Sequence, residues 1–182
     1  MNSWRKSFVS QLLSRDGVIA YPTEGVWGLG CLPGSSEGVA RILTLKNRPW
    51  QQGLLLVAAE MSQFEGYLKG LDAEYRKVLE ETWPGPVTFL VPDNGTAPGW
   101  IVGSHTTVGL RVSDHPLVQA LCTSVGPLVS TSANISSRPA ARTTFGVRRY
   151  FGNRIDLVVP GELGQTGRAS EIRDLVSGEV LR

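Results

Sequence analysis

Residues 35–59, SSEGVARILTLKNRPWQQGLLLVAA, decide the fold class of this chain. The first part places apolar side chains at helical spacing behind two serines, a residue type that caps helices, and predicts a helix that ends near Lys46. Pro49 disfavours helical backbone in the residue before it. The continuous apolar run at residues 54–59 is typical of a strand buried on both faces. A helix that leads into such a strand indicates an α/β protein.

The same alternation of helical and strand patterns continues on both sides of this stretch. Strands are predicted at residues 17–21, 54–59, 87–91, 108–112, 128–131 and 155–159, with short additions at 172 and 180–181. Helices are predicted at residues 3–15, from 35 to about 46, from 114 and from 143, with two short helices beginning near Ser62 and Asp72. Several connections are too short for helical crossovers. The sequence therefore predicts a single α/β domain over residues 1–182, with a twisted mixed sheet flanked by helices.

Length and composition narrow the class of protein. The 182 residues are 41% hydrophobic and 19% charged, and no apolar run approaches the ~20 residues of a membrane span. The N-terminus has no signal-peptide core, which predicts a cytoplasmic protein without a membrane partner. The net charge of +2 is too small to indicate general nucleic-acid binding. The two cysteines and two histidines are widely scattered, so no metal site is predicted.

Several common catalytic signatures are absent from the sequence. There is no GxxxxGK[ST] phosphate-binding loop. The glycines of residues 25–30 are spaced GxxGxG, which differs from the dinucleotide-binding GxGxxG. No Gx[SC]xG elbow supports nucleophilic catalysis. A bound phosphate would therefore have to be held by side chains and by amides at strand ends.

Two cations and a polar turn suggest where such a phosphate would bind. Lys46 and Arg48 stand two residues apart, and much later the run Ser130-Thr131-Ser132-Ala133-Asn134 follows a buried-looking strand. Cations neutralise phosphate charge, and small hydroxyl and amide groups form short hydrogen bonds with a nucleotide. A cation pair of this kind is common on protein surfaces, so the prediction depends on its combination with the polar turn. We expect the two segments to face one shared cavity.

Two further segments have both a functional and a structural interpretation. Thr23 and Glu24 stand at the exit of the first predicted strand, where α/β sheets place ligands, although a tight structural turn is equally compatible with the glycines around them. Thr107 and Arg111 share one face of a predicted apolar strand. A buried arginine must meet an anion because an unpaired buried charge is costly. That anion is either a ligand or one of the protein's own carboxylates.

Charge is unevenly distributed near the end of the chain. Residues 138–155 contain five arginines and no acidic residue. A solvated helix face and a surface that binds anions or RNA both explain this pattern.

Taken together, the motifs resemble the YrdC/TsaC family of threonylcarbamoyl-AMP synthases, in its short bacterial form. The matching segments, in order along the chain, are PTExVxGLG at 22–30, KxRP at 46–49, WPGPVTF at 83–89, TxxxR at 107–111, STSAN at 130–134 and SEIRD at 170–174. The resemblance implies a twisted α/β sheet with a positively lined concave cavity. It also implies the synthesis of L-threonylcarbamoyladenylate and pyrophosphate from L-threonine, bicarbonate or CO2, and ATP.

The resemblance also implies roles for individual residues. Those expected to bind ATP are Lys46, Arg48, Thr107, Ser132, Asn134 and Ser170. Those expected to bind threonine are Thr23, Ser130 and Arg111, the last through the threonine carboxylate. Lys46 and Arg48 would also stabilise the charge that develops as pyrophosphate leaves, which makes them the expected catalytic residues. The chemistry requires no covalent enzyme intermediate, and Mg²⁺ is expected with the ATP.

The implied partners extend beyond the small substrates. In this family a further complex transfers the threonylcarbamoyl group to adenosine 37 of tRNAs that read codons beginning with A, and residues 138–154 are a candidate tRNA contact. Two other functions remain open. One is an RNA-binding module for double-stranded RNA or tRNA, which would bind RNA in a salt-sensitive way without ATP turnover. The other is a carbamoyl-adenylating domain like those of hydrogenase maturation proteins, which share this fold.

Overall fold

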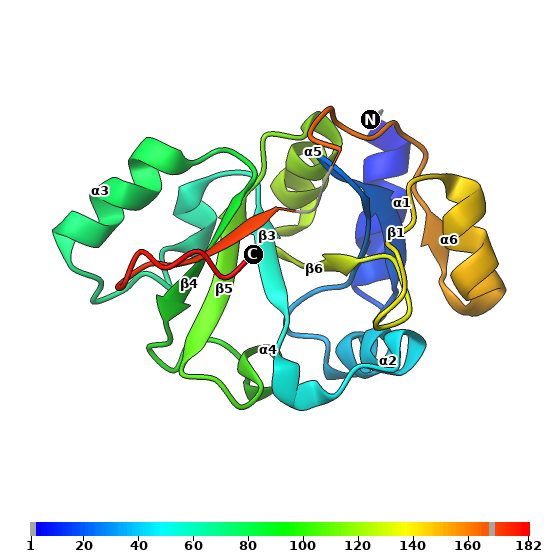
Figure 1. Ribbon diagram of the computed structural model, residues 1–182. Helices are drawn as coiled ribbons and strands as arrows, with labels where there is room; N and C mark the ends of the chain where they lie inside the picture. The colour runs from blue at the N-terminus through cyan, green and yellow to red at the C-terminus, as the bar shows by residue number, and fades with distance from the viewer. Residues whose placement is uncertain (1–2, 168–169) are drawn as a thin grey trace.

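The computed structural model describes residues 3–167 and 170–182, so positions 1, 2, 168 and 169 of the predicted domain lie outside the described residues. Figure 1 shows helices arranged around a strongly twisted sheet. Within the described residues the sheet has eight strands, in the order β7-β1-β2-β6-β3-β5-β4-β8. Their bounds are β1 Ile19–Pro22, β2 Trp27–Gly30, β3 Leu55–Ala58, β4 Val87–Pro92, β5 Thr107–Val112, β6 Leu128–Ser132, β7 Leu157–Val158 and β8 Glu171–Asp174. Pairs β1–β7, β3–β5 and β4–β8 are parallel and the others antiparallel, which confirms the predicted mixed sheet.

Apart from α4 (Gly99–Val102), which the sequence did not predict, the α-helices lie close to their predicted positions. The α-helices are α1 Ser3–Leu13, α2 Ser36–Lys46, α3 Ala73–Thr82, α4 Gly99–Val102, α5 Pro116–Val125 and α6 Thr144–Phe151. Short 3-10 turns are η1 Trp50–Gln52, η2 Met61–Phe64 and η3 Gly152–Arg154. In residues 3–167 and 170–182, no helix combines the length and apolar character that crossing a bilayer requires.

The ends of the helices show where local sequence signals were sufficient to predict a helix boundary. The Ser35 side chain caps α2 by accepting a backbone hydrogen bond, and Asn47 ends that helix in the left-handed conformation. The helix expected near Ser62 is only a 3-10 turn. Helix α5 is capped by the His115 side chain, one residue after the predicted Asp114.

Strand β2 is not among the predicted elements, because the glycines of residues 25–30 are compatible with a turn and carry no strand pattern. It pairs antiparallel with β1 on one side and with β6 on the other. All four of its residues are buried, and Gly28 and Gly30 alternate with the apolar Trp27 and Leu29. Glycine has a low strand propensity, so only the neighbouring strands show that this segment is extended.

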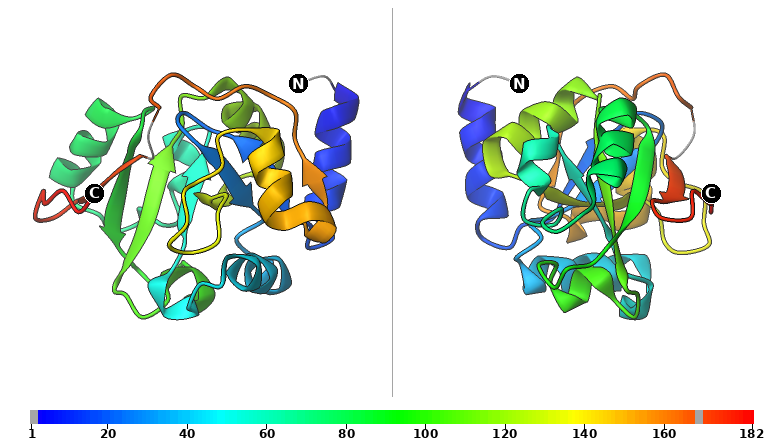
Figure 2. Two further views of the ribbon diagram at one scale, coloured as in Figure 1. Left: turned by 45° about the vertical axis from the view of Figure 1, so that its right-hand side comes forward. Right: turned by 90° about the vertical axis from the view of Figure 1, so that its left-hand side faces the viewer.

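Apolar clusters cover both faces of the sheet. Val57 of β3 packs with Leu121 of α5 in one cluster, to which α1 also contributes. Its neighbour Leu56 points to the opposite face and packs in a second cluster with Ile42 of α2 and Val147 of α6. In the second view of Figure 2, α1 and α5 lie together on one side of the molecule and β8 lies on the other.

Gly30 offers a test of the β2–β6 packing. A methyl group at this position would lie 2.5 Å from the carbonyl oxygen of Val129 on β6. We expect Gly30→Ala to lower the free energy of unfolding by about 1–3 kcal/mol in urea denaturation, because the substitution forces two neighbouring strands apart. Gly34→Ala is the matched control, since a methyl group there meets no atom within 4 Å. Equal stability of the two variants would contradict this account.

Candidate functional site

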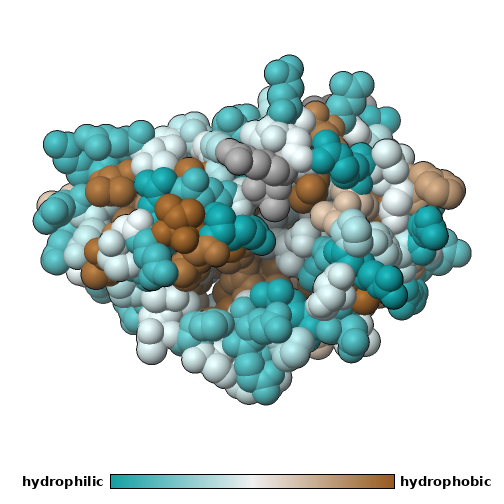
Figure 3. Space-filling view, viewed as in Figure 1, coloured by the Kyte–Doolittle hydropathy of each residue, from teal (hydrophilic) through white to brown (hydrophobic). Residues whose placement is uncertain are grey.

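A central cavity brings most of the predicted site residues together. Figure 3 shows a hollow near the middle of the face seen in Figure 1, with apolar surface at its base and hydrophilic residues around it. The cavity has a volume of about 320 Å³. Seven of the nine predicted site residues line it: Thr23, Arg48, Thr107, Arg111, Ser130, Ser132 and Ser170. The other two, Lys46 and Asn134, do not line this cavity and lie directly behind Ser132.

Strand register explains why residues distant in sequence meet here. Ser130 of β6 is opposite Leu55 of β3, which is opposite Gly109 of β5. Thr107 and Arg111 flank Gly109 on the same face of β5. A methyl group at Gly109 would lie 2.2 Å from a methyl carbon of Leu55. The absence of a side chain at Gly109 therefore leaves room for the Leu55 side chain on this face of the strand.

Lys46 binds the polar turn directly. Its ammonium donates hydrogen bonds to the Ser132 carbonyl, to the Asn134 carbonyl at 2.9 Å and to Asn134 Oδ1 at 3.2 Å. The Ser132 hydroxyl also donates to Asn134 Oδ1 at 2.6 Å. The residue is only 2% exposed. Lys46 therefore holds the turn in place, whatever contact it makes with a ligand.

The pKa of Lys46 responds to opposing influences. Burial, assisted by the nearby Arg48, lowers it to about 7. The three acceptor oxygens favour the ammonium, which can donate three hydrogen bonds. An anion bound close by would favour the charged form further.

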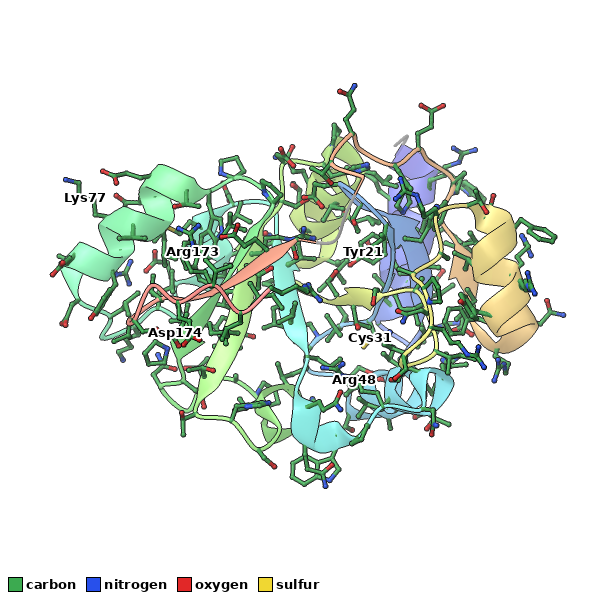
Figure 4. The ribbon with its side chains drawn as sticks, viewed as in Figure 1. Tyr21, Cys31, Arg48, Lys77, Arg173 and Asp174 are labelled. Atoms are coloured by element: carbon green, nitrogen blue, oxygen red, sulfur yellow. The ribbon has the colours of Figure 1, made fainter. Side chains whose placement is uncertain are left out.

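Three arginines give the cavity an excess of positive charge. Arg48, Arg111 and Arg182 all line it. Arg48 donates to the carbonyls of Gln52 at 3.1 Å and Gly53 at 3.0 Å, and in Figure 4 it lies in the segment that joins α2 to β3. Burial lowers the pKa of Arg48, with Arg182 adding to the shift, and burial also lowers the pKa of Arg182, with Arg111 adding. An anion in the cavity would relieve this repulsion.

Arg182 is not among the predicted site residues, because nothing in the sequence distinguishes it from a surface arginine. The backbone of Leu181 bonds to Ile172 of β8 at 2.8 Å, which brings the end of the chain against the sheet. The Arg182 side chain then donates to the Ser170 carbonyl at 3.1 Å. The Ser170 hydroxyl is 3.1 Å from that of Thr88, another cavity residue that the sequence did not indicate.

Arg111 is paired with an acid of the protein itself. Its Nη1 lies 3.0 Å from Glu24 Oε2, and both side chains are buried. The Ser113 hydroxyl donates to the other Glu24 oxygen at 2.5 Å. Arg111 can pair with this carboxylate and also bind a ligand anion. A guanidinium has five donors, and this one also lines the cavity.

The histidines differ in their surroundings. His115 caps α5, and its Nε2 donates to the Glu162 carbonyl at 3.0 Å, so its role is structural. His105 is exposed and lines the cavity. Among residues 3–167 and 170–182, no three His, Cys, Asp or Glu side chains are grouped as they would be around a metal ion.

The arginines of residues 138–155 differ in their contacts: some bond to backbone carbonyls of the protein, and others are exposed. Arg142 donates to the Gly167 carbonyl at 2.5 Å, and Arg154 donates to the carbonyls of Tyr150 and Phe151 at the end of α6. Arg148 and Arg149 are exposed on α6. They follow the exposed Phe145 at helical spacing and lie on the same side of α6.

Comparisons with known proteins agree with the geometry. The family model Sua5_yciO_yrdC, described as "Telomere recombination", matches residues 11–182. The chain is 49% identical to a threonylcarbamoyl-AMP synthase of Cellvibrio japonicus, over 98% of this chain and 95% of that protein. It is 50% identical to another of that name from Stutzerimonas stutzeri, over 100% of this chain and 98% of that protein.

Solved structures extend the likeness to the fold. A structure of P. abyssi Sua5 complexed with L-threonine has a TM-score of 0.89 and 28% sequence identity, covering 96% of this chain and 52% of that one. The chain thus spans about half the length of that protein. The E. coli YciO structure, with a TM-score of 0.87, covers 100% of this chain and 89% of that one, and at 24% identity it supports the fold alone.

Proposed function

The chain belongs to the Sua5/YciO/YrdC family, and we propose that it is a threonylcarbamoyl-AMP synthase that uses the central cavity as its active site. Full-length relatives of this name are about half identical to it. The observation that carries the assignment is the convergence of cations and small polar groups from five separate segments on one cavity. This arrangement favours the synthase over a module that only binds RNA.

The proposed reaction joins L-threonine, bicarbonate and ATP. The threonine amine attacks CO2 derived from bicarbonate to give a carbamate, and a carbamate oxygen attacks the α-phosphorus of ATP. Pyrophosphate leaves, and water is the remaining product of the bicarbonate. Arg48 and Arg182 line the cavity and would neutralise phosphate charge there, while Lys46 supports Ser132 and Asn134 through hydrogen bonds.

Magnesium enters this proposal as part of the nucleotide substrate. Glu24 is the one carboxylate side chain among the described residues that line the cavity, and Arg111 and Ser113 already engage it. These residues do not form a dedicated cage of oxygen ligands. Mg²⁺ is commonly bound largely through substrate phosphates, so the substrate would be MgATP.

The remaining partners follow from the fate of the product. The adenylate is a reactive mixed anhydride, which requires a protein complex that accepts it and transfers the threonylcarbamoyl group to tRNA. ATP, threonine and tRNA are all cytoplasmic, so we place the protein there.

Arg48→Ala tests the assignment of the cavity. We expect threonine- and bicarbonate-dependent pyrophosphate release to fall at least about tenfold, since one lost cation costs on the order of 3 kcal/mol of transition-state stabilisation. Lys77→Ala is the control: Lys77 is exposed on α3, remote from Arg48 in Figure 4. Near-normal turnover of Arg48→Ala would refute the role of this residue.

Proton uptake on ATP binding tests Lys46. With its pKa lowered to about 7, much of the free protein carries a neutral Lys46 at about pH 8. Bound triphosphate raises that pKa, so ATP binding at this pH should take up protons, and the uptake should fade below about pH 6, where Lys46 is already charged. Calorimetry in buffers of different ionisation enthalpy measures it. Lys46→Arg should abolish the uptake because a guanidinium stays charged; a wild-type protein without uptake would contradict the prediction.

We also propose that α6 contacts tRNA through Arg148, Arg149 and Phe145. Exposed arginines beside an exposed aromatic ring suit a phosphate backbone and an unstacked base. The double variant R148A/R149A should weaken tRNA binding and reduce the slope of log affinity against log salt by about one or two. Its synthase turnover should match that of the wild type. An unchanged salt slope would exclude this surface.

A further inference from the structure

Glu24 lines the cavity and carries a buried carboxylate with one oxygen that accepts no hydrogen bond. Its side chain is 6% exposed. Oε1 accepts the Ser113 hydroxyl, whereas Oε2 accepts no hydrogen bond, although it lies 3.0 Å from Arg111 Nη1. The ion pair with Arg111 offsets the cost of burying this charge, and a ligand N–H would complete the hydrogen bonding of Oε2.

The backbone fixes this carboxylate in place. The Thr23 hydroxyl donates to the Val26 carbonyl at 2.8 Å and closes the turn between β1 and β2. The Gly164 amide donates to the Thr23 carbonyl at 3.0 Å, and a methyl group at Gly164 would lie 2.8 Å from the Glu24 backbone. The turn is therefore held from both sides, as a preorganised binding group must be.

Glu24 and Arg111 together match a free amino acid. At neutral pH an α-amino acid carries a carboxylate and an ammonium on one carbon. A buried site for such a zwitterion needs one fixed charge of each sign, because either charge left unpaired would be expensive to bury. No other acidic side chain among the described lining residues can balance the ammonium.

We propose that Glu24 binds the α-ammonium group of the amino-acid substrate while Arg111 binds its α-carboxylate. The ion pair seen between the two side chains would open to admit the zwitterion between them. This inference rests on the proposed synthase function. It makes Glu24 the residue that selects α-amino acids against hydroxy acids, and that fixes the nitrogen from which the carbamate forms.

The test compares Glu24→Gln with the wild type in direct binding of two ligands by calorimetry. One is L-threonine; the other is (R)-3-hydroxybutanoate, which keeps the carbon skeleton, hydroxyl and carboxylate but has hydrogen in place of the amine. We expect the variant to bind threonine at least about tenfold more weakly, and to bind the analogue and ATP within about threefold of the wild type. Glu162→Gln, the same change at an exposed position, should alter nothing.

Three outcomes would count against the proposal, and they are distinguishable. Wild-type threonine affinity in Glu24→Gln would overturn it, with the synthase function intact. An equal loss for threonine and the analogue would also overturn it, because Glu24 would then only support the cavity. A wild-type protein that binds ATP but not threonine would overturn the proposed function itself. Partial recovery of threonine binding in Glu24→Asp, which restores the charge on a shorter side chain, would support the ammonium contact.

Discussion

The buried ammonium of Lys46 is the contact on which the site depends. It joins the end of α2 to the turn after β6 by donating to the Ser132 carbonyl and to two oxygens of Asn134. Since β6 lies between β2 and β3 in the sheet, this contact fixes the end of α2 to the centre of the sheet. A neutral apolar side chain could fill the same space. It would leave these buried oxygens without a donor, at the cost of desolvating each one.

The excess of positive charge around the cavity is the second constraint on this structure. Arg48, Arg111 and Arg182 approach one another closely enough that each of Arg48 and Arg182 has a pKa lowered by burial and by an arginine neighbour. The fold supports this repulsion through its apolar clusters on both faces of the sheet. A bound polyanion relieves the repulsion between the arginines. The repulsion that lowers the stability of the free protein therefore strengthens the binding of a triphosphate.

Glu24 shows why a structural and a functional interpretation of one residue need not compete. It forms an ion pair with Arg111 in the free protein, so neither of these buried groups lacks a partner of opposite charge. The same residue lines the cavity, and its buried Oε2 accepts no hydrogen bond. A site with its own internal ion pair avoids the cost of unpaired charge before the substrate arrives.

Sequence alone determined the fold class, because helical and strand periodicities are local, and it identified the segments from which the cavity is built, because cations and clustered hydroxyls are unusual beside buried strands. It could not identify β2, whose glycines carry no strand signal, nor choose between the two partners open to Arg111. Only the tertiary structure decided that Lys46 bonds the polar turn from behind while Arg48 lines the cavity, and that Arg182 and Glu24 belong to the same space. Those facts depend on strand register and on contacts between residues far apart in the chain, and neither is encoded in any single local pattern.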